Sequence, residues 1–381
     1  MNSIKRIALL TDGIFPLVIG GMQKHSFFLL QHLMKQGVTV LVYHPGGKGT
    51  LKSHVDPQLW DKLEERIIPF PEKGFMPGSY LRRSYTYATR IGEKLKEEEP
   101  VDFIYAQGFC GWTLIDEKRR GKEHPFIGVN FHGLEMFQKA EGLKQRLIQH
   151  YFQGPVKFNL EHADVAYSLG ARLTDLLKEV APKATFSEIP IGLDSAWIRE
   201  NKRPEIVFEG KKKLVFIGRA EHRKGLHLLF EILAQHAFEE LEFHFIGAVS
   251  KPKAQMKASI EFHGEIREEE KIKKILDDSH ALIIPSLSEG MPTVILEAMA
   301  RGLAVIASDV GAVNELVDGS NGILIPAGDI TAIKAALESC SAWTELDWRT
   351  RGEASRVRFQ NSFTWEKVIL RTLQDMQERI H

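Results

Sequence analysis

The sequence predicts an α/β protein built from two doubly wound, Rossmann-like lobes with a cleft between them. The chain has 381 residues, more than one compact core usually holds. Short β-rich runs alternate with longer runs of helical periodicity, which is typical of parallel sheets covered by helices on both faces. The alternation stops near residue 200 and then starts again. We therefore expect an N-terminal lobe at 1–195, a C-terminal lobe at 196–362, and a final helix at 363–381 that returns to the N-terminal lobe.

The first half holds the elements of the N-terminal lobe. An apolar strand is followed by the pair Gly20-Gly21, and a run of helical period then continues as far as Gly37. We expect a helix at 23–36 and strands at 6–11, 38–43, 103–106, 126–131 and 165–168. The segment 44–100 has no clear period and receives no assignment.

The second half repeats this order of elements with a clearer pattern. Strands are expected at 213–217, 242–246, 281–284, 304–307 and 322–325, and helices at 225–235, 268–278, 293–301 and 330–341. Proline and glycine interrupt the pattern within 194–212, where we expect the hinge between the lobes.

Composition excludes several classes of protein. The formal net charge is zero, whereas nucleic-acid binders usually carry a basic excess, so we expect no nucleic acid as partner. Cys110 and Cys340 are the only cysteines, which indicates a reducing compartment. No run approaches the ~20 apolar residues of a membrane span. We expect a cytoplasmic protein, with peripheral contact at the inner face of a membrane through the basic, aromatic segments 75–90 and 137–157 as an open alternative to ordinary helix packing.

The segment 285–297 has the pattern of an anion site. A buried strand ends, a small polar loop follows, and Pro292 stands where a proline would begin a helix. Backbone N–H groups of Gly290, Met291 and Thr293 are then available to a phosphate at the helix N-terminus. We expect Glu289 to stand in this loop at the ligand.

Cations follow the neighbouring strand. Arg219 comes directly after the strand at 213–217, and Lys224 begins the next helix. Ligands of open α/β sheets bind beyond the carboxyl ends of the strands, so both side chains are expected to neutralise a diphosphate. We expect His222 and Arg223, in the same turn, to be solvated.

Three further features are weaker candidates. The turn 262–266 is expected beside the previous two loops, where its backbone can contact a nucleobase. Gly20 and Gly21 permit close approach of backbone to a ligand, although a plain turn explains them nearly as well. His132 follows the strand at 126–131, at its carboxyl end, and is a candidate to contact the ligand there. His25, Asp12 and Glu135 are remote candidates for the acceptor site.

These motifs together closely resemble glycosyltransferase family four. The resemblance rests on Gly218-Arg219…Lys224-Gly225, His263-Gly264-Glu265-Ile266, Pro285-Ser-Leu-Ser-Glu289-Gly-Met-Pro…Glu297 and Ser308-Asp-Val-Gly311…Asn314-Glu315, and it extends more weakly to Gly20-Gly21 and His132-Gly133. Ile191 stands where the family usually has asparagine.

The resemblance implies the two-lobed GT-B fold and a retaining transfer from a UDP- or GDP-linked sugar to a hydroxyl of a sugar or lipid-linked sugar, in glycan, polysaccharide or glycolipid synthesis. It implies the catalytic residues Glu289, Arg219, Lys224 and His132, and donor contacts from Gly20, Gly21, Gly218, Gly264, Ile266, Gly290, Met291, Pro292, Thr293 and Glu297. No Asp-X-Asp triplet occurs, and cations stand where a metal would serve, so we expect no metal cofactor.

Other functions remain open. An epimerase or hydrolase on the same fold needs acid–base carboxylates in both lobes, and the sequence offers no such second pair. A catalytically silent binder of nucleotide-sugars is also compatible with the sequence. A dehydrogenase is excluded because the Gly20-Gly21 segment lacks the spaced three-glycine fingerprint.

Overall fold

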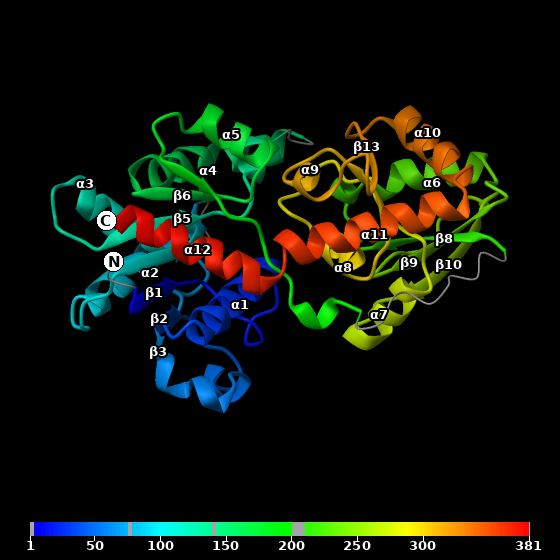
Figure 1. The fold of residues 1–381 in the computed structure, drawn as a ribbon. Helices are drawn as coiled ribbons and strands as arrows, with labels where there is room; N and C mark the ends of the chain where they lie inside the picture. Colours follow the sequence, from blue (N-terminus) through cyan, green and yellow to red (C-terminus); the bar gives the residue numbers. More distant parts are fainter. Residues whose placement is uncertain (1–3, 75–77, 139–141, 200–209, 381) are drawn as a thin grey trace. The chain divides into compact units, whose positions relative to one another are not determined.

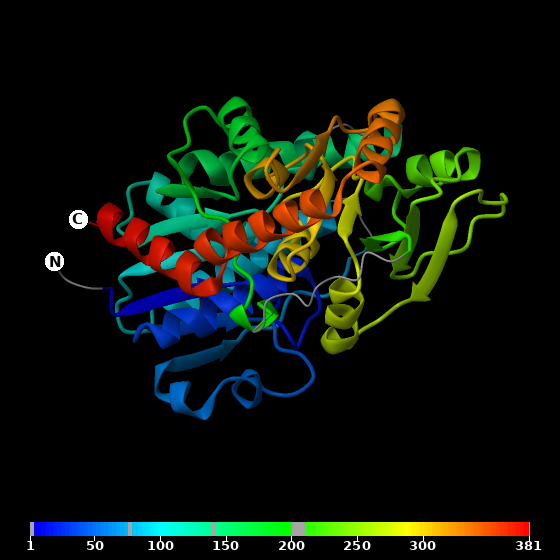
Figure 2. The same ribbon diagram turned by 45° about the vertical axis from the view of Figure 1, so that its right-hand side comes forward.

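The computed structural model describes residues 4–74, 78–138, 142–199 and 210–380, apart from the side chain of Lys144. Contacts divide the chain into two units. Unit 1 comprises Met1–Leu169, Leu173–Gly192 and Trp365–His381, and unit 2 comprises Gly170–Arg172 and Leu193–Thr364. Each unit holds one parallel sheet (Figures 1 and 2), which confirms the predicted α/β class. Most of the predicted hinge, 200–209, lies outside the described residues.

Unit 1 contains a seven-stranded sheet in the order β3-β2-β1-β4-β5-β6-β7. Its strands are β1 (Arg6–Leu10), β2 (Thr39–His44), β3 (Leu63–Ile67), β4 (Phe103–Gln107), β5 (Phe126–Asn130), β6 (Val165–Ser168) and β7 (Phe186–Glu188). The order reverses between β1 and β4, where the chain changes direction across the sheet. The five predicted strands are present, whereas β3 and β7 had no assignment.

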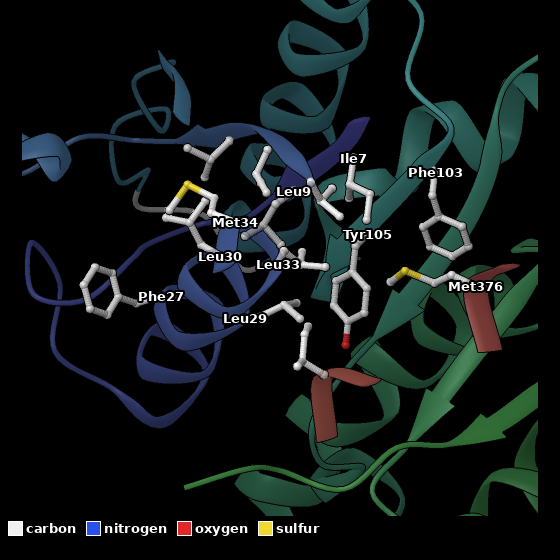
Figure 3. Close-up of a cluster of buried hydrophobic side chains, with 14 of the residues drawn as sticks. Ile7, Leu9, Phe27, Leu29, Leu30, Leu33, Met34, Phe103, Tyr105 and Met376 are labelled. Atoms are coloured by element: carbon white, nitrogen blue, oxygen red, sulfur yellow. The ribbon is translucent and has the colours of Figure 1, made fainter. Parts of the chain in front are cut away.

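Helices of unit 1 are α1 (Gly21–Lys35), α2 (Ser79–Leu95), α3 (Trp112–Arg119), α4 (Leu143–His162), α5 (Arg172–Val180) and α12 (Trp365–Ile380), with short 3-10 turns at Leu51–His54, Pro57–Lys62, Gly108–Gly111, Glu135–Phe137 and, in unit 2, Ser195–Trp197. The final helix packs on unit 1, as expected. Its Met376 joins Leu33, Phe103 and Tyr105 in the core below α1 (Figure 3). Burial of these apolar side chains holds α12 in place although it is remote in sequence.

Unit 2 contains a six-stranded sheet in the order β10-β9-β8-β11-β12-β13. Its strands are β8 (Lys212–Ile217), β9 (Leu241–Ile246), β10 (Ser259–Gly264), β11 (Ala281–Ile284), β12 (Ala304–Ser308) and β13 (Gly322–Ile325). The order reverses between β8 and β11. In such sheets ligands bind beyond the carboxyl ends of the strands at this switch point.

Helices of unit 2 are α6 (Leu226–Gln235), α7 (Glu269–Asp277), α8 (Thr293–Ala300), α9 (Val313–Leu316), α10 (Ile330–Ser341) and α11 (Glu345–Ser362), and a 3-10 turn spans His222–Lys224. The described part of the chain includes no helix with the length and apolar character needed to cross a membrane.

Candidate functional site

Two loops meet at the switch point of unit 2, one after β8 and one after β11. The N–H of Leu287 donates to the carbonyl of Arg223 at 2.7 Å. Gly225 has a φ of +68°, and a Cβ there would lie 1.8 Å from the carbonyl oxygen of Pro285. Only glycine allows both this backbone conformation and this approach. The glycine therefore brings the start of α6 against the end of β11.

Glu289 lies where these loops join. Its Oε1 accepts hydrogen bonds from Lys224 Nζ at 2.6 Å and from Ser286 Oγ at 2.7 Å, and Arg223 Nη1 lies 3.4 Å from its Oε2. The residue is 6% exposed. Glu289 stands in the loop between β11 and α8, as predicted, and its side chain is turned inward. Burial is possible because cationic and hydroxyl donors satisfy both carboxylate oxygens.

The cations are arranged differently from the prediction. Arg219 is 75% exposed and pairs with Glu221 at 3.0 Å, whereas Arg223 pairs with Glu221 at 2.7 Å and also approaches Glu289. Arg223 was expected to be solvated, and the structure instead makes it part of the charged group. His222 is exposed, as expected. The sequence of charged residues in a turn does not show which of their side chains points toward the buried carboxylate.

Helix α8 starts at Thr293, as predicted, but Pro292 is its N-cap and not a residue of its first turn. Pro292 has a φ of −73° and a ψ of 114°, so it is extended and precedes the helix. No described side chain caps this N-terminus, which leaves the first N–H groups available to an anion. Met291 is buried, and Glu297 is partly buried within α8. Gly290 is fixed by its carbonyl, which accepts from the N–H of Ala312 at 2.8 Å.

The turn after β10 is one strand further away than predicted, since β9 separates β10 from β8. The carbonyl of Gly264 accepts from the N–H of Gly247 at 2.7 Å, and the N–H of Gly218 donates to the carbonyl of Ile246 at 3.0 Å. Ile266 follows, partly buried. The three strand ends thus form a continuous edge, with the loop after β9 in the middle.

In unit 1, His132 follows β5 and has a φ of +57°, which is uncommon for a residue with a side chain. Its N–H donates to Asn130 Oδ1 at 2.7 Å. Its Nε2 lies 2.7 Å from Gln107 Oε1, and Gln107 Nε2 lies 3.1 Å from His25 Nδ1. Burial lowers the pKa of His132 to about 4. The structure therefore joins two of the predicted histidines through Gln107, which the sequence analysis missed.

His25, which contacts Gln107, is buried. Its ring lies 4.5 Å from that of His132 and 5.4 Å from that of Trp365, the first residue of α12. Burial is the main cause that lowers its pKa well below the usual value. The His25 ring therefore packs against the ring of His132 and helps to hold it in place.

A pocket lies at the switch point of unit 1, between the loops after β1 and β4. Asp12 stands in it and accepts from Tyr80 Oη at 3.3 Å, while its Oδ1 is buried without a hydrogen-bond partner among the described residues. Burial raises the pKa of this carboxyl. Half of the residues that line the pocket are aromatic: Phe70, Tyr80, Tyr87, Phe109, Phe131 and Phe152.

Gly20 and Gly21 begin α1. Gly20 has an extended backbone that any residue adopts, and a Cβ there would meet only the flexible amide end of Gln23. No described atom lies within 4 Å of where a Cβ of Gly21 would stand. The fold of unit 1 therefore gives no packing reason for glycine at 21.

Comparison with known proteins agrees with the fold and the charged loops. The model of "Glycosyltransferase Family 4" matches residues 19–196, and that of "Glycosyl transferases group 1" matches residues 211–342. The putative colanic acid biosynthesis glycosyltransferase WcaL of Salmonella typhimurium is 24% identical over 63% of this chain and 61% of its own length. This chain thus spans about three fifths of that relative. A glycogen synthase of Mycobacterium tuberculosis is 25% identical over 97% of this chain and 94% of its own.

Solved structures show the same architecture. Sucrose-phosphate synthase from Thermosynechococcus elongatus has a TM-score of 0.75 at 19% identity, covering 98% of this chain and 98% of that one. Anabaena HepE, solved in complex with UDP-glucose, has a TM-score of 0.68 at 15% identity, covering 98% and 99%. Two Rossmann-like units with this topology define a protein of the GT-B fold. The chain belongs to the family-four glycosyltransferases, as its motifs predicted.

Proposed function

We propose that the protein transfers a sugar from a nucleotide-diphosphate sugar to a hydroxyl acceptor, in the synthesis of a polysaccharide or another glycan. The observation that carries this proposal is the charged group around Glu289, with Lys224 and Arg223, at the switch point of unit 2. Family membership points to the same chemistry.

The diphosphate of the donor binds at the N-terminus of α8, where free N–H groups and Lys224, Arg223 and Arg219 supply positive charge. Backbone N–H groups of Gly290 and Thr293 donate hydrogen bonds to phosphate oxygens in the same turn. The Arg219 side chain is 75% exposed, and its guanidinium contacts the phosphate of the bound donor. Its guanidinium suits bidentate contact, whereas Lys224 acts as a compact charge.

The two carboxylates hold the sugars on either side of the diphosphate. Glu289 accepts from hydroxyls of the transferred sugar, and Glu297 accepts from the ribose. Because Lys224 already pairs with Glu289 at 2.6 Å, donor binding exchanges a protein ion pair for a contact with phosphate. After the exchange the phosphate compensates Lys224, while Glu289 keeps the hydrogen bond from Ser286 and gains those from the sugar hydroxyls.

Transfer retains the anomeric configuration and needs no protein nucleophile. The leaving phosphate oxygen takes the proton of the acceptor, while the cations stabilise the charge that grows on the diphosphate. Preorganised donors of this kind typically contribute about 2.7–4 kcal/mol each. The protein cations fill the role of a metal, so transfer is metal-independent and requires no cofactor.

The remaining predicted residues complete the donor site. Gly264 and Ile266 present backbone to the base, and Gly20, Gly21 and Gly218 allow close approach of backbone. Neutral His132, oriented by Gln107, contacts the donor sugar or phosphate as a hydrogen-bonding group and not as a cation.

The pocket at Asp12 takes the acceptor. Aromatic rings offer faces for a sugar ring or for the apolar part of a lipid-linked sugar, and the unpartnered carboxylate oxygen accepts a hydroxyl. Exposed apolar side chains of α4, Leu143, Leu147, Ile148 and Tyr151, lie on one side of the helix and suit peripheral contact with the inner face of a membrane. The buried, unpaired cysteines agree with a cytoplasmic site of action.

A thermal-shift screen with UDP, GDP, ADP and their sugar conjugates tests the proposal and identifies the base. A ligand at 100 times its Kd adds about 2.7 kcal/mol of stability, enough to measure. Binding of one nucleotide family, followed by release of that nucleoside diphosphate in the presence of an acceptor, supports transfer. Binding without turnover favours the silent-partner alternative, and conversion of the donor sugar without an acceptor favours an epimerase.

A further inference from the structure

Histidine and glutamate side chains gather on one face of the sheet of unit 2, at the edge formed by β9 and β10. His244 of β9 stands opposite Glu261 of β10 in the register. Side chains alternate between the faces of a strand, so Glu242 shares the face of His244. His263 lies where the register of β10 shifts, and its ring stacks on that of His244 with centroids 5.2 Å apart. Two histidines and two carboxylates are thereby placed together on neighbouring strands.

The opposite face of these strands explains why the polar groups gather here. Phe245 and Phe262 stack there with ring centroids 5.2 Å apart, and Phe230 of α6 packs on both. The alternation of phenylalanine with histidine or glutamate therefore follows from one apolar and one polar face. It does not explain why the polar face carries metal-ligating groups at contact distance.

We propose that His244, His263 and Glu261 form a binding site for a zinc ion. His244 Nδ1 lies 2.9 Å from His263 Nε2 and 3.7 Å from Glu261 Oε2. One ligand atom from each of the three side chains lies within 4.8 Å of the others. Zinc binds imidazole nitrogen and carboxylate oxygen at roughly 2.0–2.2 Å, so its ligand atoms stand roughly 3.3–3.6 Å apart in a tetrahedron. Small side-chain rotations satisfy that geometry, and water takes the fourth position.

The second nitrogen of His244 supports this assignment. His244 is 5% exposed, and its Nε2 has no hydrogen-bond partner among the described residues. It lies 3.5 Å from Glu242 Oε2. Metal at Nδ1 places the proton on Nε2, facing that carboxylate. Histidine ligands of zinc usually donate their other N–H to such a carboxylate, which orients the ring.

The site differs from the donor site in its position and its role. It lies on β9 and β10, whereas Lys224 and Glu289 belong to the loops after β8 and β11. Zinc bound here links the edge strand β10 to β9 and stabilises the turn that starts at Gly264. The inference does not depend on the proposed transfer, and its test needs no substrate.

The test is zinc binding by the full chain after removal of metal with EDTA and gel filtration. Calorimetric titration is expected to show one zinc per chain with a Kd below 10 µM, and zinc is expected to raise the Tm. Co²⁺ in place of zinc is expected to give the visible absorption of a site with nitrogen and oxygen ligands.

His263→Gln and Glu261→Gln should each weaken zinc binding at least tenfold. Both leave the buried His244 in place, so the packing of the sheet is preserved. Glu242→Gln should weaken binding by about 10–100-fold through the orientation of His244. His236→Gln, at the end of α6 outside the cluster, is the matched control and should bind as the unaltered chain does. Absence of saturable binding below 100 µM, or equal affinity in His263→Gln, overturns the proposal in favour of a simple hydrogen bond between the two histidines.

Discussion

Lys224 Nζ lies 2.6 Å from Glu289 Oε1, and both side chains are largely buried, at 15% and 6% exposure. The pair joins the loop after β8 to the loop after β11. Neither charge is tolerated alone in such surroundings, because desolvation of an unpaired ion costs several kcal/mol. Each charge of the pair is therefore compensated by the other.

Lys224→Met is expected to lower the free energy of unfolding by about 3–5 kcal/mol, because Glu289 then keeps only the more distant Arg223 as a cationic partner. Chemical denaturation measures this change. The double variant Lys224→Met with Glu289→Gln should recover most of the loss, since no buried charge remains unpaired. Arg219→Met, which removes an exposed pair, should change stability by about 1 kcal/mol or less. A fully stable Lys224→Met protein would show that the pair does not hold the loops.

Arg219→Gln is expected to reduce kcat about 10²–10³-fold while leaving the Tm unchanged. Its side chain is 75% exposed, so little folding energy depends on it, whereas the transition state loses one donor to the diphosphate. Arg349→Gln is the control, because Arg349 also pairs with a glutamate on the surface of unit 2 but lies on α11. Steady-state kinetics with the donor found by the nucleotide screen provide the measurement. Equal rates in both variants would remove Arg219 from the site.

EDTA is expected to leave the rate of transfer unchanged at saturating donor, because protein cations neutralise the diphosphate. The assay compares initial rates with EDTA, with added Mg²⁺ and with added Mn²⁺. If EDTA removes zinc from the β9–β10 edge, the expected effect is a lower Tm and not a slower reaction at ambient temperature. Strict dependence on a divalent cation would contradict the proposed chemistry.

Gly225→Ala should destabilise unit 2 far more than Gly264→Ala. The two glycines have nearly the same backbone angle, φ +68° and φ +70°, so both substitutions carry about the same strain of roughly 1–2 kcal/mol. Only at 225 does the new Cβ collide with backbone, 1.8 Å from the carbonyl oxygen of Pro285. Denaturation of the two variants separates the clash from the strain. A similar loss of unfolding free energy in both variants would mean that the loops after β8 and β11 can move apart to relieve the clash.

His132→Asn is expected to make the stability of the protein less sensitive to acid. Burial lowers the folded pKa of His132 to about 4, below the unfolded value of about 6.5. Between these values the unfolded chain binds a proton that the folded chain does not, so stability falls as pH falls from 6.5 to 4. One such group contributes about 1.4 kcal/mol per pH unit.

Asparagine suits the left-handed conformation at 132, so the backbone is preserved in this variant. As the pH is lowered from 7.5 to 5, the free energy of unfolding should therefore decline less steeply in His132→Asn than in the unaltered protein. Parallel slopes would indicate that His132 titrates normally.

Local sequence patterns were sufficient for most of the sheets. Strand β11 was placed with its observed bounds, because a fully buried parallel strand is a continuous apolar run. The edge strand β3 was not predicted, because none of its residues is fully buried and its sequence is largely charged. Helix α11 was not predicted for another reason. Gly352 and Ser355 form half of its buried stripe with Trp348 and Phe359, so apolar periodicity is absent.

The sequence by itself determined the fold class, the family, and the loops in which the charged residues stand. These follow from hydrophobic period and from motifs of adjacent residues. Only the tertiary structure decided that Glu289 is buried, that Arg223 and not Arg219 approaches it, and that Gln107 links His132 to His25. Each of these outcomes depends on contacts between segments tens of residues apart. Such contacts are set by how strands are ordered in a sheet and how closely its loops pack, which no local pattern encodes.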